Sequence, residues 1–157
     1  MSKIILETLI NSTPMICYKL SLSVDLHQLS TSKTSEHTVD GVREGIMKLD
    51  DSVTWRAKHF GVWQNLTTKI TQTKPHEYFV DEMQKGAFKS MRHEHYFKEK
   101  DGITMMKDVF NFTSPLGILG IIFNKLILEN YMKEFLVERN QLIKEIAESD
   151  NWQYYVK

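Results

Sequence analysis

Residues 88–115 read FKSMRHEHYFKEKDGITMMKDVFNFTSP, and the order of secondary structure follows from them. Two runs with regular alternation, Phe88–Lys98 and Ile103–Phe112, flank Lys100-Asp101-Gly102, which is a strong short hairpin signal. Ser114-Pro115 then combines a capping residue with a proline, which the first helical position tolerates because no amide donor is needed there. The stretch predicts two antiparallel strands followed by the start of a helix.

The strand pattern extends towards the N-terminus. Runs separated by Gly, Pro, Asn or Asp predict an antiparallel meander over Glu36–Asp40, Ser52–Phe60, Val62–Thr73 and Glu77–Met83. Ahead of the meander, the sequence predicts a strand over Ile4–Ile10, a capped helix over Pro14–Ser21 and a helical turn over Val24–Leu29. Residues 30–35 are polar and predict a loop.

A long helix is predicted to begin at Pro115 and to end near Ser149, because apolar residues recur there at helical spacing. A sheet with one apolar face needs a cover, so we expect the sheet to curl around this helix. One helix cannot fill a strongly curved sheet, and a hollow should remain between them. We predict one α+β domain over residues 1–149, followed by a tail, 150–157, whose aromatic residues indicate docking.

Composition excludes several classes of protein. Among 157 residues, Lys+Arg and Asp+Glu each number 20, and a formal net charge of zero disfavours a nucleic-acid binder. Leu116–Leu128 is interrupted by Asn124 and Lys125 and is too short for stable membrane insertion. Cys17 is the only cysteine and no signal peptide is evident, which favours a reducing, cytoplasmic location. Nothing in the sequence sets an oligomeric state.

Several segments also share features with a known superfamily. They are Val53–Gly61, Phe88–His95, Thr104–Phe110, Ser114–Gly120, and Tyr131–Glu148 with its Glu138-Arg139-Asn140. Together they make the chain resemble the START-like and birch-pollen-allergen-like helix-grip superfamily, often called SRPBCC. Within it, the chain is similar to bacterial ligand-binding proteins related to polyketide cyclases and dehydratases.

This resemblance implies a helix-grip fold with a hydrophobic cavity between the sheet and the C-terminal helix. Because the superfamily includes carriers, receptors, cyclases and chaperone regulators, fold alone does not choose a function. The leading hypothesis is a non-catalytic binder of a small hydrophobic molecule, lipid-like or polyketide-like. The alternatives are a cyclase or dehydratase acting in the same cavity, and a module that regulates another protein through the outer sheet face.

Strand alternation places candidate polar residues inside the cavity. His93 and His95 share a face of one strand, and Asp108 and His59 lie on the inward faces of two others. His93, His95 and Asp108 are the candidate catalytic residues, since a histidine with a carboxylate partner can transfer protons near neutral pH. The alternative is that they satisfy one another's hydrogen bonds or orient a ligand. Two histidines without a cysteine are a weak zinc signal, so we predict no metal and no cofactor.

The remaining candidates would line the cavity and contact the ligand. They are Trp55, His59, Trp63, Phe79, Met91, Met106, Phe110, Phe112, Ile122, Met132 and Arg139. The aromatic members could equally be plain core. For Arg139 we expect the stem to cover apolar surface and the head to reach water, with binding of an acidic ligand group as the alternative. Leu116–Ile122 is either a helix start packed on the sheet, a gate, or a segment that touches membranes transiently.

Overall fold

One sheet of seven strands organises the molecule, with the order β1-β7-β6-β5-β4-β3-β2 and antiparallel pairing throughout. The computed structural model describes residues 1–114 and 127–157. The strands are β1 (Ser2–Ile10), β2 (His37–Gly41), β3 (Ser52–His59), β4 (Val62–Lys74), β5 (Tyr78–Lys85), β6 (Ser90–Lys100) and β7 (Ile103–Thr113). The helices are α1 (Pro14–Leu22), α2 (Val24–Ser30) and α4 (Glu129–Ala147), with short 3₁₀ helices η1 (Ser32–Thr34) and η3 (Asp150–Tyr154).

The predicted hairpin joins β6 to β7. Lys100 pairs with Ile103, and the two residues between them, Asp101 and Gly102, have φ angles of 53° and 78°. Positive φ at both central positions is the geometry whose twist matches that of the flanking strands, and Asp-Gly adopts it readily. The turn therefore fixes the register of the β6–β7 pair, which has the longest run of paired residues in the sheet.

The two short helices begin at side-chain caps. Thr13 accepts a hydrogen bond from the amide of Ile16, with Pro14 opening α1. Ser23 does the same for α2 through the amide of Leu26. Each cap satisfies an amide that has no partner within its own helix. The polar segment after α2 differs from the prediction, because three of its residues form η1 rather than an open loop.

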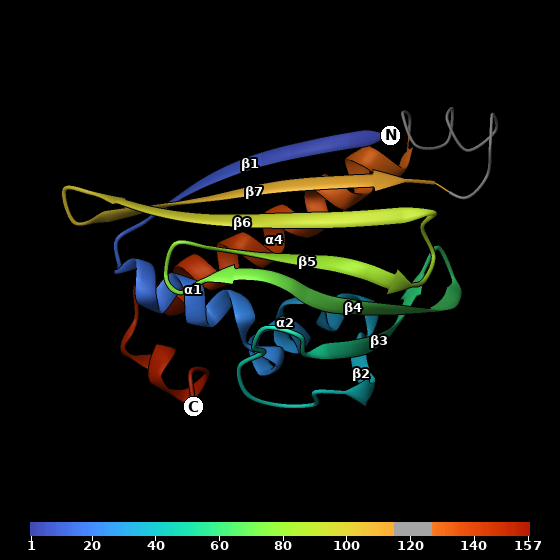
Figure 1. Cartoon of the computed structure of the whole chain (residues 1–157), viewed down its shortest axis with the longest axis horizontal. Coiled ribbons are helices and arrows are strands. Elements are labelled where there is room, and N and C mark those ends of the chain that lie inside the picture. Colours follow the sequence, from blue (N-terminus) through green and yellow to red (C-terminus); the bar gives the residue numbers. More distant parts are fainter. Residues whose placement is uncertain (115–126) are drawn as a thin grey trace.

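Helix α4 lies across the concave face of the sheet, and α1 and α2 pack against α4 (Figure 1). Its buried residues, among them Leu136, Ile143 and Ala147, recur at helical spacing and face the sheet. The predicted curved sheet around a C-terminal helix is thus confirmed. The expected helix start, with Ile122 and the Leu116–Ile122 segment, falls on 115–126, which lie outside the described residues.

Two buried apolar clusters form the core. The first joins α1, α2, the start of β3 and the C-terminal end of α4, and includes Leu20, Val53 and Ile143. The second gathers Ile4, Met91, Phe110, Phe112, Leu128 and Leu136 at the other end of α4. Residues 150–157 return to the first cluster, where Trp152 and Tyr155 pack, whereas Tyr154 is 69% exposed.

Candidate functional site: a cavity between the sheet and α4

A cavity of about 400 Å³ lies between the sheet and α4, where the two core clusters do not meet. Its walls come from α1, α2, strands β3 to β7 and α4, and they include members of both clusters. This volume falls within the roughly 300–1,000 Å³ typical of small-molecule pockets. The hollow has a simple origin, since the sheet curves away from a single straight helix.

Strand alternation decides which side chains reach the cavity. On β3, Trp55 and Ala57 line it, and on β4 the inward residues are Leu66 and Thr68. Trp63 is an odd-numbered β4 residue, and the same alternation turns it outward, where it is 45% exposed. It does not line the cavity.

The structure brings most of the predicted ligand-contacting residues together. Those that line the cavity are Trp55, His59, Phe79, Met91, Phe110, Met132 and Arg139. Met106 faces the same side of the sheet but sits under α1, where the Ser21 hydroxyl lies 3.5 Å from its sulfur. Phe112 is 1% exposed within the second cluster. Alternation correctly places both on the inner face, yet neighbouring elements cover them.

Asp108 lies beside the two buried histidines, on the side away from the cavity. Its Oδ1 lies 3.0 Å from Nε2 of His93, in a hydrogen bond, and 2.8 Å from Nδ1 of His95. Its Oδ2 accepts a 2.6 Å hydrogen bond from the side-chain amide of Asn140 on α4. His93 and His95 line the cavity, whereas Asp108 is 1% exposed and does not. Asp108 therefore orients His93 through a hydrogen bond and lies beside His95, rather than meeting a ligand itself.

The buried position of this cluster sets its protonation. Burial, followed by repulsion from His95, lowers the pKa of His93 to about 4, so its imidazole is neutral at pH 7. Burial would raise the pKa of Asp108, but its contacts with His93 and His95 hold that pKa well below its usual range. A buried carboxylate thus remains ionised beside the neutral imidazole of His93. A base with a pKa near 4 is a weak proton acceptor at neutral pH.

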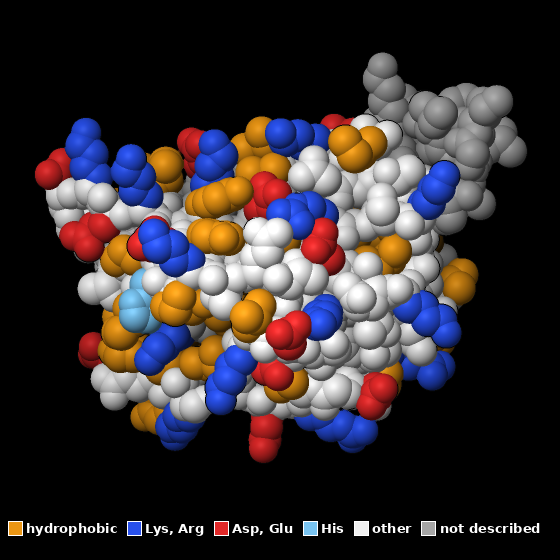
Figure 2. All heavy atoms as spheres, in the orientation of Figure 1, with side chains coloured by type: hydrophobic (Ala, Val, Ile, Leu, Met, Phe, Trp, Pro, Cys, Tyr) orange, Lys and Arg blue, Asp and Glu red, His pale blue; other side chains and the backbone are white. Residues whose placement is uncertain are grey.

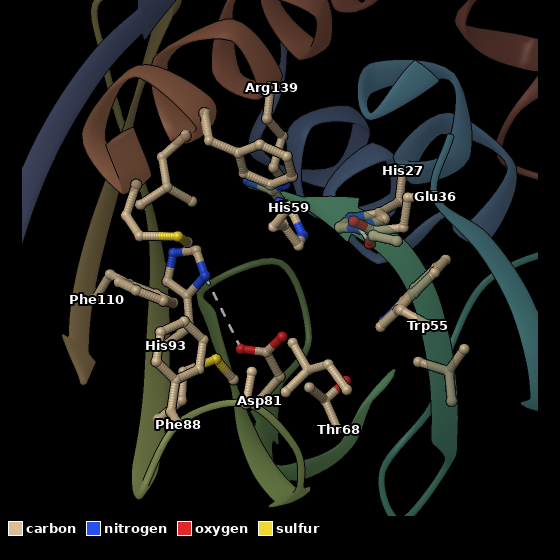
Figure 3. A pocket seen from close by; sticks show the side chains of 18 of the residues that line it. His27, Glu36, Trp55, His59, Thr68, Asp81, Phe88, His93, Phe110 and Arg139 are labelled. Atoms are coloured by element: carbon tan, nitrogen blue, oxygen red, sulfur yellow. Dashed lines mark hydrogen bonds and ion pairs between the residues drawn. The ribbon is translucent and has the colours of Figure 1, made fainter. Parts of the chain in front are cut away.

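Asp81 is a site residue that the sequence reasoning missed. It pairs directly with His93 across β5 and β6, and its Oδ1 lies 4.0 Å from Nδ1 of His93 and 3.8 Å from Nε2 of His95. Figure 3 shows Asp81 and His93 pointing towards each other at the cavity wall. A signal existed, because Phe79 was expected to face inward and Asp81 is two residues further along the same strand.

Two further polar pairs lie at the cavity; of their four residues, the sequence predicted only His59. Nε2 of His27 lies 2.7 Å from Oε1 of Glu36, and the imidazole packs against Trp55 with ring centroids 4.2 Å apart. Nδ1 of His59 and the hydroxyl of Tyr131 are hydrogen-bonded at 2.7 Å. Burial lowers the pKa of His59 and raises that of Tyr131, which favours the neutral form of both.

Arg139 departs from the expectation that its head reaches water. The residue is 6% exposed, and its guanidinium donates to the Ser21 carbonyl and to Oδ1 of Asn140, at 3.2 and 3.1 Å. It also lies 3.7 Å from Oδ1 of Asp108. A buried cation requires paired acceptors, and the end of α1 and the Asp108 cluster supply them. Arg139 still contributes to the cavity wall.

The surface in this view carries charges of both signs. Lys and Arg side chains lie among Asp and Glu side chains over the face shown in Figure 2. Within the described part of the chain, no helix is long and apolar enough to cross a membrane.

Comparisons with known proteins identify the fold. No protein-family model matches the sequence, and the curated proteins contain no similar sequence. Among solved structures, TTHA0849 from Thermus thermophilus superposes with a TM-score of 0.74 at 14% identity, over 92% of this chain and 95% of that one. The major latex-like protein 151 of Panax ginseng gives 0.69 at 15% identity, over 94% and 98%. A START superfamily protein from Mycobacterium smegmatis gives 0.67 at 9% identity, over 93% and 97%. The chain therefore has the START-like helix-grip fold that the resemblance implied.

Proposed function

We propose that the protein binds a small, largely apolar molecule in the cavity between the sheet and α4. The observation that carries this proposal is an unfilled space of about 400 Å³ whose walls are mostly apolar side chains. Native interiors are packed closely enough that such a space is uncommon unless something uses it. The likeness to START-like and latex-like structures supports the proposal at the level of the fold.

The polar groups of the wall constrain the ligand. Hydrogen-bonded or charged groups form three pairs in the wall: Asp81 with His93 on the sheet, His27 with Glu36 beside Trp55, and His59 with Tyr131. Most of the remaining lining side chains are apolar. The best match is a molecule with an apolar body and few polar atoms, because each buried polar group of a ligand needs a partner.

The test starts from the full chain, isolated gently and examined by native mass spectrometry for a bound small molecule. A fluorescent probe with an apolar aromatic body and one sulfonate, 1-anilinonaphthalene-8-sulfonate, then measures affinity. Ala57→Phe projects a ring into the cavity, and Lys58→Phe places the same ring on the outer face of β3. We expect Ala57→Phe to weaken probe binding at least tenfold and Lys58→Phe to leave it unchanged. Equal binding by the two variants would reject the cavity as the binding site.

A second candidate is cyclase- or dehydratase-type chemistry in the same cavity. The observation that favours it is the placement of His93 and His95 at the wall, with Asp108 behind them. Against it stands the low pKa of His93, which makes a poor general base at pH 7. Substituting His93, His95 and Asp108 distinguishes the two functions, because a catalytic role requires turnover to vanish while ligand binding persists.

The regulatory-module alternative is the least supported. It would be favoured by a fully packed interior, whereas about 400 Å³ is unfilled. A cytoplasmic location remains part of the proposal, and the single buried thiol of Cys17, which forms no disulfide, supports it.

A further inference from the structure

Three side chains at the cavity wall present metal-ligand atoms to a common point. Asp81 and His93 are directly opposed across β5 and β6, and His95 lies two residues from His93 on the same face. One ligand atom from each lies within 4.8 Å of the other two. The three residues come from two paired strands, so the sheet holds their backbones rigidly.

Asp108 lies on the far side of both imidazoles from Asp81. Its Oδ1 is hydrogen-bonded to His93 Nε2 at 3.0 Å, and it lies 2.8 Å from His95 Nδ1, which makes no hydrogen bond within the described residues. The opposite nitrogens, His93 Nδ1 and His95 Nε2, then face Oδ1 of Asp81 at 4.0 and 3.8 Å. A carboxylate that holds the non-ligating nitrogen of a histidine is the usual outer support of metal sites.

A buried oxygen at this point also lacks a partner. Oδ1 of Asp81 has no hydrogen bond to any group in residues 1–114 or 127–157. Buried polar atoms are nearly always paired, and an ion is one of the ordinary explanations for an exception. The two carboxylates, Asp81 and Asp108, carry two negative charges against the single positive charge of nearby Arg139, at 3.7 Å from Asp108. A divalent cation would offset this local excess of negative charge.

The geometry points to a divalent transition-metal site of the zinc class, ligated by Asp81 Oδ1, His93 Nδ1 and His95 Nε2 and open to the cavity. Zinc binds imidazole nitrogen at about 2.0–2.1 Å and carboxylate oxygen at about 2.0–2.2 Å, which places tetrahedral ligands roughly 3.3 Å apart. The observed 3.8 and 4.0 Å separations need to close by less than about 1 Å. Three protein ligands leave one position for water or for an oxygen of a bound molecule. The site does not depend on the proposed apolar ligand.

The test uses the full chain, stripped with a chelator and titrated with Zn²⁺ alone by isothermal calorimetry. We expect one equivalent to bind with micromolar or tighter affinity. Asp81→Asn and His95→Gln should each weaken binding at least a hundredfold. His37→Gln, on the exposed strand β2, is the matched control and should stay within twofold of the parent. Asp108→Asn tests positioning, with a loss of about 10–100-fold expected for an outer support.

Substitution with Co²⁺ adds a readout that a merely structural change does not produce. The bound ion should give the visible absorption of a tetrahedral nitrogen–oxygen site, and the Asp81→Asn variant should lose it. Thermal unfolding checks that each variant is folded. If His95→Gln unfolds, Asp81→Glu, which displaces the carboxylate by one methylene, replaces it and should also weaken binding.

The proposal is overturned if the parent binds no zinc at 100-fold molar excess, or if Asp81→Asn binds as tightly as His37→Gln. Binding of 1-anilinonaphthalene-8-sulfonate is measured on the same samples. Probe binding without zinc binding would refute the metal site alone, while zinc binding without probe binding would refute only the apolar ligand.

Discussion

Asn140 connects α4 to the buried carboxylate of the sheet, and replacing it by alanine should be costly. The residue is 2% exposed, and its amide donates to Oδ2 of Asp108 at 2.6 Å and to the Thr8 hydroxyl at 3.3 Å. A hydrogen bond to a charged group contributes about 1.5–3 kcal/mol, and a neutral one about 0.5–1.5 kcal/mol. Because Asp108 stays buried and ionised after the change, we expect Asn140→Ala to lower the free energy of unfolding by roughly 3 kcal/mol.

The assay is equilibrium unfolding in urea, monitored by tryptophan fluorescence. With a slope of about 1–3 kcal/mol per molar urea, a loss of this size lowers the midpoint by roughly 1–3 M. Gln141→Ala is the control, because among the described residues its side-chain amide donates a hydrogen bond to the exposed Glu145 of the same helix, at 2.9 Å, and to no other group. It should change stability by less than about 0.5 kcal/mol. A loss below about 1 kcal/mol for Asn140→Ala, or equal losses for both variants, would refute the reasoning.

Three further predictions concern the backbone at Gly41, the buried thiol of Cys17, and the two tryptophans of opposite faces, Trp55 and Trp63. A Cβ at Gly41, where φ is +78°, would sit 2.1 Å from a backbone oxygen of β3, whereas Gly61, at φ +77°, has nothing within 4 Å. Alanine at Gly61 should lower the free energy of unfolding by about 1–2 kcal/mol, and alanine at Gly41 should lower it by clearly more. Thermal unfolding measures both variants, and equal falls in melting temperature would contradict this. Burial raises the pKa of the Cys17 thiol to about 11, so at pH 8 its thiolate is about a hundredfold scarcer than that of a free cysteine. Iodoacetamide should label the folded chain at least that much more slowly than the chain in urea, and rapid labelling would show that the thiol is accessible. Trp55→Ala should weaken binding of the apolar probe, while Trp63→Ser, on the outer face, should not, as fluorescence titration would show.

Local rules predicted the elements well because each depends on neighbours in the chain. Asp101-Gly102 favours the positive φ angles of its turn regardless of what the strands pack against. Thr13 and Pro14 start α1 by satisfying or removing amide donors. Alternation along β6 likewise turned His93 and His95 to the inner face.

Covering of the inner face was harder to predict. Met106 and Phe110 share a face of β7, yet α1 covers the first and the cavity borders the second. The difference depends on where a distant helix crosses the strand. Arg139 shows the same limit, because its acceptors, Ser21 and Asn140, could be recognised only once α1 and α4 were packed together.

The sequence by itself therefore determined the strands, their turns, the cap of α1 and the face of the sheet on which the strand side chains lie, since these follow from local backbone preferences and a two-residue period. Only the tertiary structure decided that Asp81 meets the two histidines and that about 400 Å³ stays unfilled. Both depend on strand register and on the curvature of the sheet against α4. Those quantities arise from contacts between residues far apart in the chain, which no local pattern encodes.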